Sequence, residues 1–342
     1  MTYAPASWFS DDEVPGEMTA SHNSSPALDK LIRHIEDILD CEIFVHRETD
    51  APPHGILLDT FSYTTNKNVI VFSSAQLGLL KDFVIAQNSV RILMRGMAHR
   101  RGNYRVLSYN AGMAGHGMNQ IYLDTLKDEK TRGLLIWQKK KLMYYLYMLF
   151  HESISDVPWE ILANVFIAKR CEVLQNAQTY FLIKESMRDM HELVSFKEML
   201  PRRYFVLHNA MYYARDMYLA DITAELKLNP MINIPELQKF KNLDVKEMMS
   251  HRWSQSYWYH TKIVGDAMTN IIRMVMNFDF SGTLDEDYYY RMYELGQEIT
   301  NRWLMMMRMQ EWYSWEPPGH LREAETRAQE IEDIATQFVF GI

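Results

Sequence analysis

The part of the chain that follows Lys127 carries a helical pattern with few interruptions. Apolar residues recur there three and four residues apart in one segment after another, the spacing that places them on one face of an α-helix. Ile161–Ile167 is apolar nearly all round, which is typical of a helix enclosed by other helices. The 342 residues include only 14 Gly and 11 Pro, too few for a turn-rich all-β fold. The pattern therefore predicts a multi-helix bundle.

The part before residue 127 combines helical and β-like patterns. Pro26 opens a predicted helix. The apolar positions of this helix are Leu28, Leu31, Ile32, Ile35 and Leu39. Short β-like runs follow at Glu42–Arg47, Gly55–Tyr63 and Asn68–Phe72. Turn-forming residues between the runs favour a small antiparallel meander. A long helix is then expected to start at Ser74 as its N-cap and to end near Gly96 or Gly102.

The expected fold class is mainly α, with a multi-helix bundle and a small N-terminal α+β unit. We expect a polar tail over residues 1–25, the α+β unit over residues 26–126, and the helical bundle over residues 127–342, packed as one body with the α+β unit. The predicted helices of the bundle are Leu134–Phe150, a segment capped by Asp156 with Pro158 in its first turn, Leu174–Leu193, Pro201 to about Leu228, a helix that starts at Asp244, Tyr257–Phe278, Asp285–Trp315 and Arg322–Phe338.

Composition indicates which cellular compartment and which classes of partner to expect. Hydrophobic residues make up 47% and charged residues 23% of the chain, as in ordinary globular proteins. The two cysteines, Cys41 and Cys171, provide no disulfide framework and favour a reducing cytoplasm. The longest apolar run, Leu142–Phe150, is about half the length of a membrane span, and no signal peptide is expected. A net charge of −8 disfavours general nucleic-acid binding. We therefore expect a soluble cytoplasmic protein that binds neither membranes nor nucleic acids in general.

The sharpest catalytic signal is an incomplete metal motif. His151 and Glu152 begin a His-Glu-x-x-His pattern, but Ser155 stands where the second His is needed. In zinc hydrolases two imidazoles four residues apart share the metal and the Glu acts as a base. Asp189 and His191 are further candidates for a catalytic or metal site, and Glu172 and His208 are other ligand types nearby in sequence. The commoner alternative is that His151 bonds a carboxylate or a carbonyl at a helix end.

A second candidate site combines arginines with glycines. No acidic residue lies between Gln87 and Tyr122, although the chain is acidic overall. The candidate anion-binding residues are Arg91, Arg95, Arg101, Arg105, Gly112, Gly115 and Gly117. Glycines between a predicted strand at Tyr104–Tyr109 and a helix from about Met118 allow backbone N–H groups to converge on an anion. The spacing matches neither the dinucleotide fingerprint nor the P-loop. The alternatives are a connector beside a solvated basic face and a surface for an acidic protein.

Charged residues inside apolar helices and a Met/aromatic segment are the remaining candidates. Buried charges are tolerated when they pair, so we expect those of the bundle to pair between helices. These charged or polar residues include His208, Arg215, Asp216, Asp221, Glu225, Asp266, Asn270, Arg273, Glu294, Glu298 and Arg302. Met and aromatic residues are frequent, with 24 Met in the chain. The segment Trp303–Trp315 is expected to form core, or else a partner or dimer face.

The sequence thus favours a non-catalytic binding or assembly protein. We expect it to bind an anionic ligand or an acidic partner through Arg91–Gly117, and a protein partner or second copy through Met/aromatic helix faces. No cofactor and no resident metal are expected. The alternative is a metal- or carboxylate-dependent hydrolase with a degenerate zinc-peptidase-like site around His151 and Glu152, which would need a divalent metal.

Overall fold

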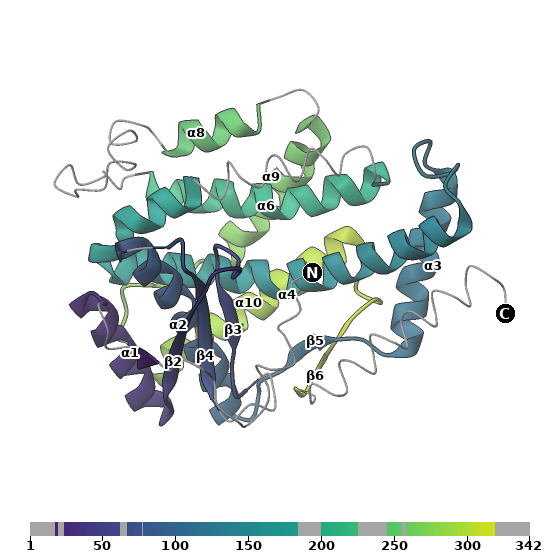
Figure 1. Ribbon diagram of the computed structural model, residues 1–342. Helices are drawn as coiled ribbons and strands as arrows, with labels where there is room; N and C mark the ends of the chain where they lie inside the picture. The colour runs from purple at the N-terminus through teal and green to yellow at the C-terminus, as the bar shows by residue number, and fades with distance from the viewer. Residues whose placement is uncertain are drawn as a thin grey trace. The chain divides into compact units, whose positions relative to one another are not determined.

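The chain is mainly α-helical with a small α+β unit, as predicted (Figure 1). This computed structural model describes residues 18–19, 24–61, 67–76, 78–183, 200–224, 245–254 and 258–318. It divides into two compact units, Met1–Tyr104 and Arg105–Ile342. The boundary lies about 20 residues before the one expected near residue 126, because the helix before Lys127 packs on the bundle. Packing of the two units as one body stays a prediction.

The described residues of unit 1 form a four-stranded sheet and two helices. Its elements are β1 (Met18–Thr19), α1 (Pro26–Leu39), β2 (Ile43–Glu48), β3 (Ile56–Leu58), β4 (Asn68–Ser73) and α2 (Gly78–Arg100). Helix α1 starts as the sequence predicts: Pro26 follows the N-cap Ser25, whose side chain accepts a hydrogen bond from the backbone of Leu28. All five predicted apolar positions of α1 are buried. Helix α1 packs on α2, which starts at Gly78, four residues after the expected cap Ser74.

The strand order of unit 1 differs from a meander. The order is β1-β2-β4-β3, in which β4 runs parallel to β2 and antiparallel to β3. Ile70–Ser73 of β4 is buried at every position, and a strand that is apolar on both sides belongs in the interior of a sheet. The most apolar strand therefore takes a central position, and β3 lies at the edge.

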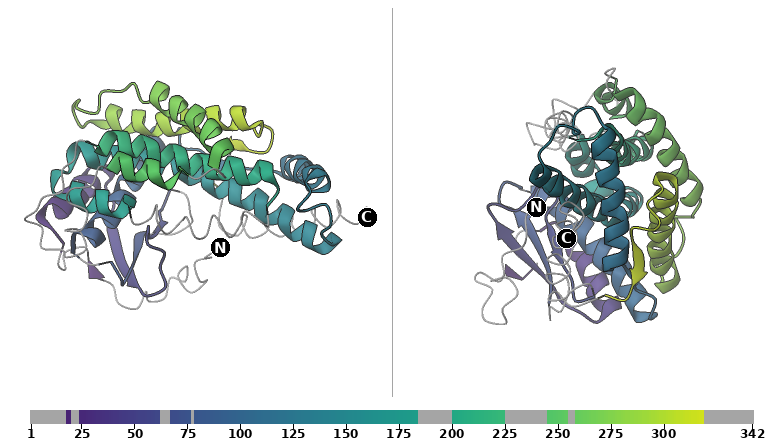
Figure 2. Two further views of the ribbon diagram at one scale, coloured as in Figure 1. Left: turned by 90° about the horizontal axis from the view of Figure 1, so that it is seen from above. Right: turned by 90° about the vertical axis from the view of Figure 1, so that its right-hand side faces the viewer.

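In the part of unit 2 that the structure describes, the helices form a bundle and two short strands pair as a ribbon (Figure 2). Its elements are β5 (Val106–Ser108), α3 (Ala111–Lys127), α4 (Ile136–Arg170), the 3-10 turn η2 (Glu172–Leu174), helical residues 175–183, α6 (Arg202–Thr223), α8 (Val245–Arg252), α9 (Tyr259–Val275), α10 (Glu286–Met307) and β6 (Ser314–Glu316). Strands β5 and β6 pair antiparallel. Helix α4 contacts α3, α6 and α10, and α6 also packs on α8 and α9.

Helix α4 is one continuous helix, whereas the sequence pattern predicts two segments. Pro158 lies inside it, so the Ile154 carbonyl has no N–H donor four residues later. The hydroxyl of buried Thr300 on α10 lies 3.5 Å from this carbonyl. A hydroxyl from a neighbouring helix thus faces the carbonyl that Pro158 leaves without a backbone donor.

The predicted helix Asp285–Trp315 also ends earlier than expected. Helix α10 starts after its N-cap Asp285 and ends at Met307, where Arg308 has a left-handed backbone conformation with φ of 59°. Trp315 lies in β6. Trp303 and Trp312 are fully buried, so this segment contributes to the core. The predicted helix Arg322–Phe338 lies outside the described residues, as do most of the expected tail and the ends of two predicted helices beyond residues 183 and 224. Within the described part of the chain, no helix combines the length and apolar character of a membrane span.

Candidate interaction site

His151 forms a structural contact within unit 2. Its Nε2 lies 2.8 Å from the carbonyl oxygen of Leu107 in β5, and its ring contacts the rings of Tyr109 and Tyr313. Burial lowers the pKa of His151, although the bond to Leu107 acts in the opposite direction. The neutral imidazole therefore donates its Nε2–H to the strand. Bonding of His151 to a carbonyl is confirmed, but the position is the middle of α4 rather than a helix end.

The other residues of the predicted metal site do not assemble around His151 in the described residues. Glu152 is exposed. His208 on α6 is buried against the rings of Phe150 and Tyr212, and burial lowers its pKa to about 4. Asp189 and His191 lie outside the described residues. Among those that are described, no three His, Cys, Asp or Glu side chains form a group able to hold a metal ion.

The predicted arginine and glycine site is divided between the two units. Arg91, Arg95 and Arg101 belong to unit 1, and Arg105 and the glycines belong to unit 2. Arg95 forms an ion pair of 2.6 Å with the fully buried Asp59, so this guanidinium neutralises a carboxylate of its own unit. Arg101 is exposed just after α2. The backbone N–H of Arg105 donates to the Tyr293 hydroxyl at 2.8 Å.

The glycines lie in a helix rather than in a loop. Helix α3 starts at Ala111 instead of about Met118, because the Asn110 side chain caps it by accepting a hydrogen bond from the backbone of Met113. Gly112, Gly115 and Gly117 therefore occupy its first two turns. A Cβ added at Gly117 would lie 2.7 Å from the ring of Tyr147 and 2.9 Å from that of Trp312. Gly117 thus permits a close approach between α3 and two aromatic rings.

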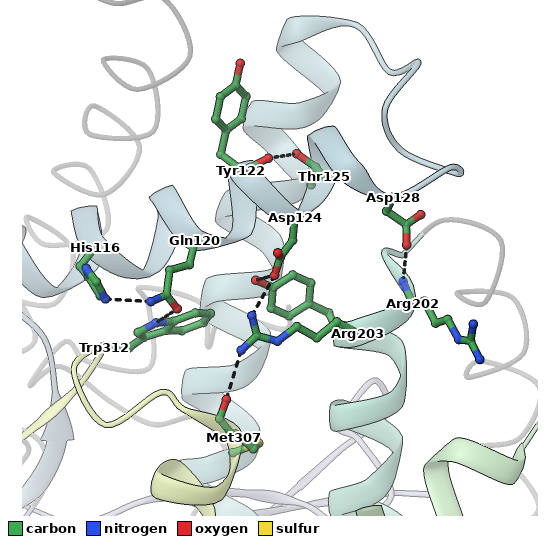
Figure 3. Close-up of polar contacts among 11 residues, drawn as sticks. His116, Gln120, Tyr122, Asp124, Thr125, Asp128, Arg202, Arg203, Met307 and Trp312 are labelled. Atoms are coloured by element: carbon green, nitrogen blue, oxygen red, sulfur yellow. Dashed lines mark hydrogen bonds and ion pairs between the residues drawn. The ribbon is translucent and has the colours of Figure 1, made fainter.

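One face of α3 carries a row of polar contacts that joins it to the bundle (Figure 3). Gln120 accepts a hydrogen bond from the Trp312 indole at 3.0 Å. One turn later, Asp124 accepts from the Arg203 guanidinium and the Tyr204 hydroxyl, both at 2.9 Å. Asp128 accepts from the backbone N–H of Arg202 at 2.8 Å. These contacts fix α3 and its C-terminal end to α6 and to the segment after α10.

Charged residues in the bundle interior pair as predicted. Arg215 lies 3.3 Å from Glu160 on α4 and 3.0 Å from its neighbour Asp216. The Trp253 indole donates to Asp216 at 3.3 Å. Asp221 pairs with Lys246 at 2.6 Å and with Arg273. Hydrogen bonds to these two cations lower the pKa of Asp221, against the effect of burial, which raises it. Glu294 and Glu298 instead pair within α10, with Arg291 and Arg302.

Among the described residues, exposed apolar side chains are most frequent at the end of α3 and the start of α4. We define the hairpin tip as five exposed apolar side chains from the end of α3 and the start of α4. They are Leu123, Leu126, Leu135, Ile136 and Trp137, with exposed fractions of 44%, 43%, 60%, 51% and 52%. They make up half of the ten large apolar side chains that are exposed in the described residues. Single exposed apolar residues are ordinary, but five of them within 15 residues of one helical hairpin make it a candidate interaction surface.

Basic residues flank the hairpin tip in the sequence. We define the tip cations as the exposed residues Lys127, Lys130, Arg132 and Lys141. The ammonium of Lys141 lies 5.5 Å from the centre of the Trp137 ring, within range of a cation–π contact. Residues 127–141 contain six basic and two acidic residues, a net charge of +4 in a chain whose net charge is −8. The hairpin tip is therefore both apolar and locally cationic.

The start of α4 is poorly suited to helix stability. Its N-cap is the apolar Leu135, which provides no side-chain cap, and its first turn has no acidic residue. Lys139, Lys140 and Lys141 follow at once, although the N-terminal end of a helix favours negative charge. The Gln138 side chain accepts from the Leu135 backbone at 2.8 Å. Departures from local stability rules concentrate at functional sites, which points to the hairpin tip.

The hairpin tip was not among the predicted sites, although the sequence holds a signal for it. Leu134–Trp137 is an apolar run between basic residues, but alone it is indistinguishable from the start of a core helix. Comparison of the chain with family models, with curated proteins and with solved structures finds no match in any of the three.

Proposed function

We propose that this protein is a non-catalytic binding protein whose hairpin tip docks an acidic, partly apolar segment of a protein partner. The observation that carries the proposal is the concentration of exposed apolar side chains among the tip cations. This keeps the acidic partner that the sequence favours and places its binding surface on α3 and α4 instead of the Arg91–Gly117 region. Cytoplasmic location and the absence of membrane binding are part of this proposal.

Magnitudes support a partner that is both apolar and acidic. Full burial of a large apolar side chain contributes roughly 1.5–3 kcal/mol, so covering five half-exposed ones contributes on the order of 5 kcal/mol. Association costs at least about 4 kcal/mol in lost freedom. Apolar contact with the hairpin tip alone therefore leaves little net affinity. Carboxylates placed near the tip cations would supply attraction and orientation.

The other two predicted sites receive less support. His151 donates to Leu107, and the hydrolase would need ligands beyond the described residues. At the predicted anion site, Arg95 is paired with Asp59 and Gly117 packs against aromatic rings. Anion binding at Arg91–Gly117 stays a prediction of the sequence, as does an interface on other Met/aromatic faces.

The test uses labelled peptides and fluorescence anisotropy. The probe is a synthetic peptide with Leu at helical spacing and Glu elsewhere, compared with a scrambled peptide of equal composition and with a Lys counterpart. The tip variant is Leu135→Ser/Ile136→Ser/Trp137→Ser. The matched control, Tyr259→Ser/Ile263→Ser/Met274→Ser, changes side chains of similar exposure on α9. We expect the Glu peptide to bind best, the tip variant to bind at least tenfold more weakly, and the control to bind normally.

Three results would overturn the proposal. One is equal binding by the tip variant and the control. Another is equal affinity for the Glu and Lys peptides, because the tip cations would then provide no selectivity. The third is tighter binding to phosphatidylserine vesicles than to the Glu peptide, lost in the tip variant, because the hairpin tip would then bind a lipid surface.

A further inference from the structure

Helix α9 carries a second exposed apolar surface, on the side opposite to the face that it buries. We define the α9 stripe as the exposed residues that fall within about 80° of one another at about 100° per residue. They are Tyr259, Ile263, Ala267, Asn270 and Met274. The buried residues of α9 lie on the other side and are Thr261, Gly265, Met268, Thr269, Ile272 and Val275. The outward face of a surface helix is ordinarily charged or polar. In α9, which the structure describes throughout, this face holds one amide and no charged residue.

Two of the three charged residues of α9 bond to α6. Asp266 accepts a hydrogen bond from the Tyr213 hydroxyl at 2.8 Å, and Arg273 pairs with Asp221. With two basic residues and one acidic residue, α9 has a net charge of only +1. The α9 stripe therefore offers no charge that would select an oppositely charged partner or repel a copy of itself. The hairpin tip differs in this respect, because its local charge of +4 disfavours contact with a second hairpin tip.

We propose that the α9 stripe is a contact between two copies of this chain, in which the two α9 helices cross at Ala267. Ala267 is the middle residue of the 17-residue helix. Two crossing helices are closest at the crossing point, where a small side chain permits an interaxial distance of about 8 Å. The larger Tyr259, Ile263 and Met274 lie toward the ends, where crossing helices diverge and leave space for them. A small residue at the centre also suits a two-fold contact, in which both copies use the same surface.

The size of the α9 stripe indicates a weak, reversible dimer. The exposed fractions of Tyr259, Ile263 and Met274 are 62%, 54% and 61%. Roughly 100 Å² from each of these side chains, together with their neighbours, gives on the order of 800 Å² for the two copies. Stable interfaces bury about 1,200–2,000 Å², and smaller ones belong to transient contacts. We therefore expect half of the protein to dimerise at a concentration on the order of 100 µM.

Sedimentation velocity of the full chain over a range of concentrations tests the dimer. The α9 variant is Tyr259→Ser/Ile263→Ser/Met274→Ser, which also serves as the control in the peptide experiment. We expect the wild type and the tip variant to shift toward the dimer as concentration rises, and the α9 variant to stay monomeric throughout. Normal binding of the Glu peptide by the α9 variant would show that its loss of dimerisation does not come from unfolding.

Disulfide cross-linking tests where the two copies meet. In Ala267→Cys the two new thiols lie at the crossing point, where the Cα atoms come within the about 4.4–6.8 Å that a disulfide requires. We expect mild oxidation near 100 µM protein to give a covalent dimer on a non-reducing gel. Met305→Cys, at a position on α10 with an exposed fraction of 67%, is the control. It should remain mainly monomeric, as should the wild type with Cys41 and Cys171.

The outcomes distinguish this contact from the docking function of the hairpin tip. The dimer is excluded if the wild type stays monomeric well above 100 µM, or if the α9 variant dimerises as the wild type does. Dimerisation that is lost in the tip variant but kept in the α9 variant would assign the contact to the hairpin tip instead. Faster cross-linking of Met305→Cys than of Ala267→Cys would also contradict a crossing at Ala267. Because none of these measurements uses the Glu peptide, the dimer and the proposed function stand or fail separately.

Discussion

At the scale of single residues, buried polar side chains join distant parts of unit 2. His151 donates to Leu107 across 44 positions. The Tyr147 hydroxyl donates to the Trp312 carbonyl at 2.8 Å, and the Tyr313 hydroxyl donates to the Tyr147 carbonyl at 2.9 Å. These bonds attach the strand ribbon and the chain after α10 to α4. The His of the incomplete metal motif therefore belongs to a set of structural hydrogen bonds.

The role of His151 leads to a stability prediction. His151→Phe keeps a ring between Tyr109 and Tyr313 but removes the donor to Leu107. We expect the free energy of unfolding in urea to fall by about 1–3 kcal/mol, the cost of a buried acceptor left without its donor. Glu152→Gln, at the exposed neighbouring position, should change it by less than about 0.5 kcal/mol. A larger loss in Glu152→Gln than in His151→Phe would contradict this assignment.

Gly117 shows a limit of prediction from sequence. Its role depends on Tyr147 and Trp312, which lie 30 and 195 positions further along the chain, and no local pattern connects the three. The pairing of charges was predictable because burial in an apolar helix requires it whichever partners are chosen. Which carboxylate faces Arg215 was not predictable, because that depends on how α4 and α6 pack.

Two glycines of α3 provide a matched pair of variants. In Gly117→Ala the new Cβ meets the Tyr147 and Trp312 rings at under 3 Å. We expect overpacking to lower the unfolding free energy by about 1–3 kcal/mol, despite the better helix propensity of Ala. At Gly112 the nearest such atom is the Asn110 side-chain oxygen at 3.4 Å, so Gly112→Ala should be neutral or stabilising by up to about 1 kcal/mol. Thermal unfolding followed by circular dichroism measures both, and equal melting temperatures would argue against a close approach at Gly117.

At the scale of elements, the helices follow from periodicity, but their ends and breaks depend on tertiary contacts. Helix α1 has the predicted cap and the predicted buried face. Helix α4 passes through Pro158 because other helices enclose it and Thr300 faces the open carbonyl. Helix α10 stops at Met307, where the Met309 and Arg308 backbone N–H groups bond to carbonyls of its last turn. Neither the continuation of α4 through Pro158 nor the end of α10 at Met307 has a strong signal in the local sequence.

The start of α4 gives a prediction in which stability and binding change in opposite directions. Leu135 has the extended backbone of an N-cap residue but no capping side chain. In Leu135→Asp a carboxylate would accept from the first turn and meet the positive end of the helix. We expect a gain of about 0.5–2 kcal/mol in unfolding free energy, together with weaker binding of the Glu peptide. Leu135→Ala, which removes the apolar side chain without adding a cap, is the control. A loss of stability in Leu135→Asp would show that Leu135 contributes to packing.

At the scale of the whole molecule, the buried and paired ionisable groups differ in the pH range over which their contribution to stability is lost. The pKa of Asp221 lies below its ordinary value of 3.8, so the stability that it contributes is lost only in strong acid. His208 and His151 reduce stability at milder pH, because burial lowers their pKa values in the folded protein below the ordinary 6.5. Acid sensitivity between pH 7 and pH 5 should therefore come from buried histidines rather than from paired carboxylates.

His208 allows this pH dependence to be tested. Its pKa is about 4 in the folded protein and 6.5 ordinarily, so between these values the unfolded chain binds a proton that the folded chain excludes. Stability is then complete above about pH 6.5 and falls as the pH decreases toward 4, by about 2 kcal/mol at pH 5. His208→Gln should be less stable than the wild type at pH 7 but should lose less on going to pH 5, as measured by urea unfolding. His260→Gln, at an exposed position, should keep the wild-type slope. An unchanged slope in His208→Gln would mean that His208 gains access to water before the protein unfolds.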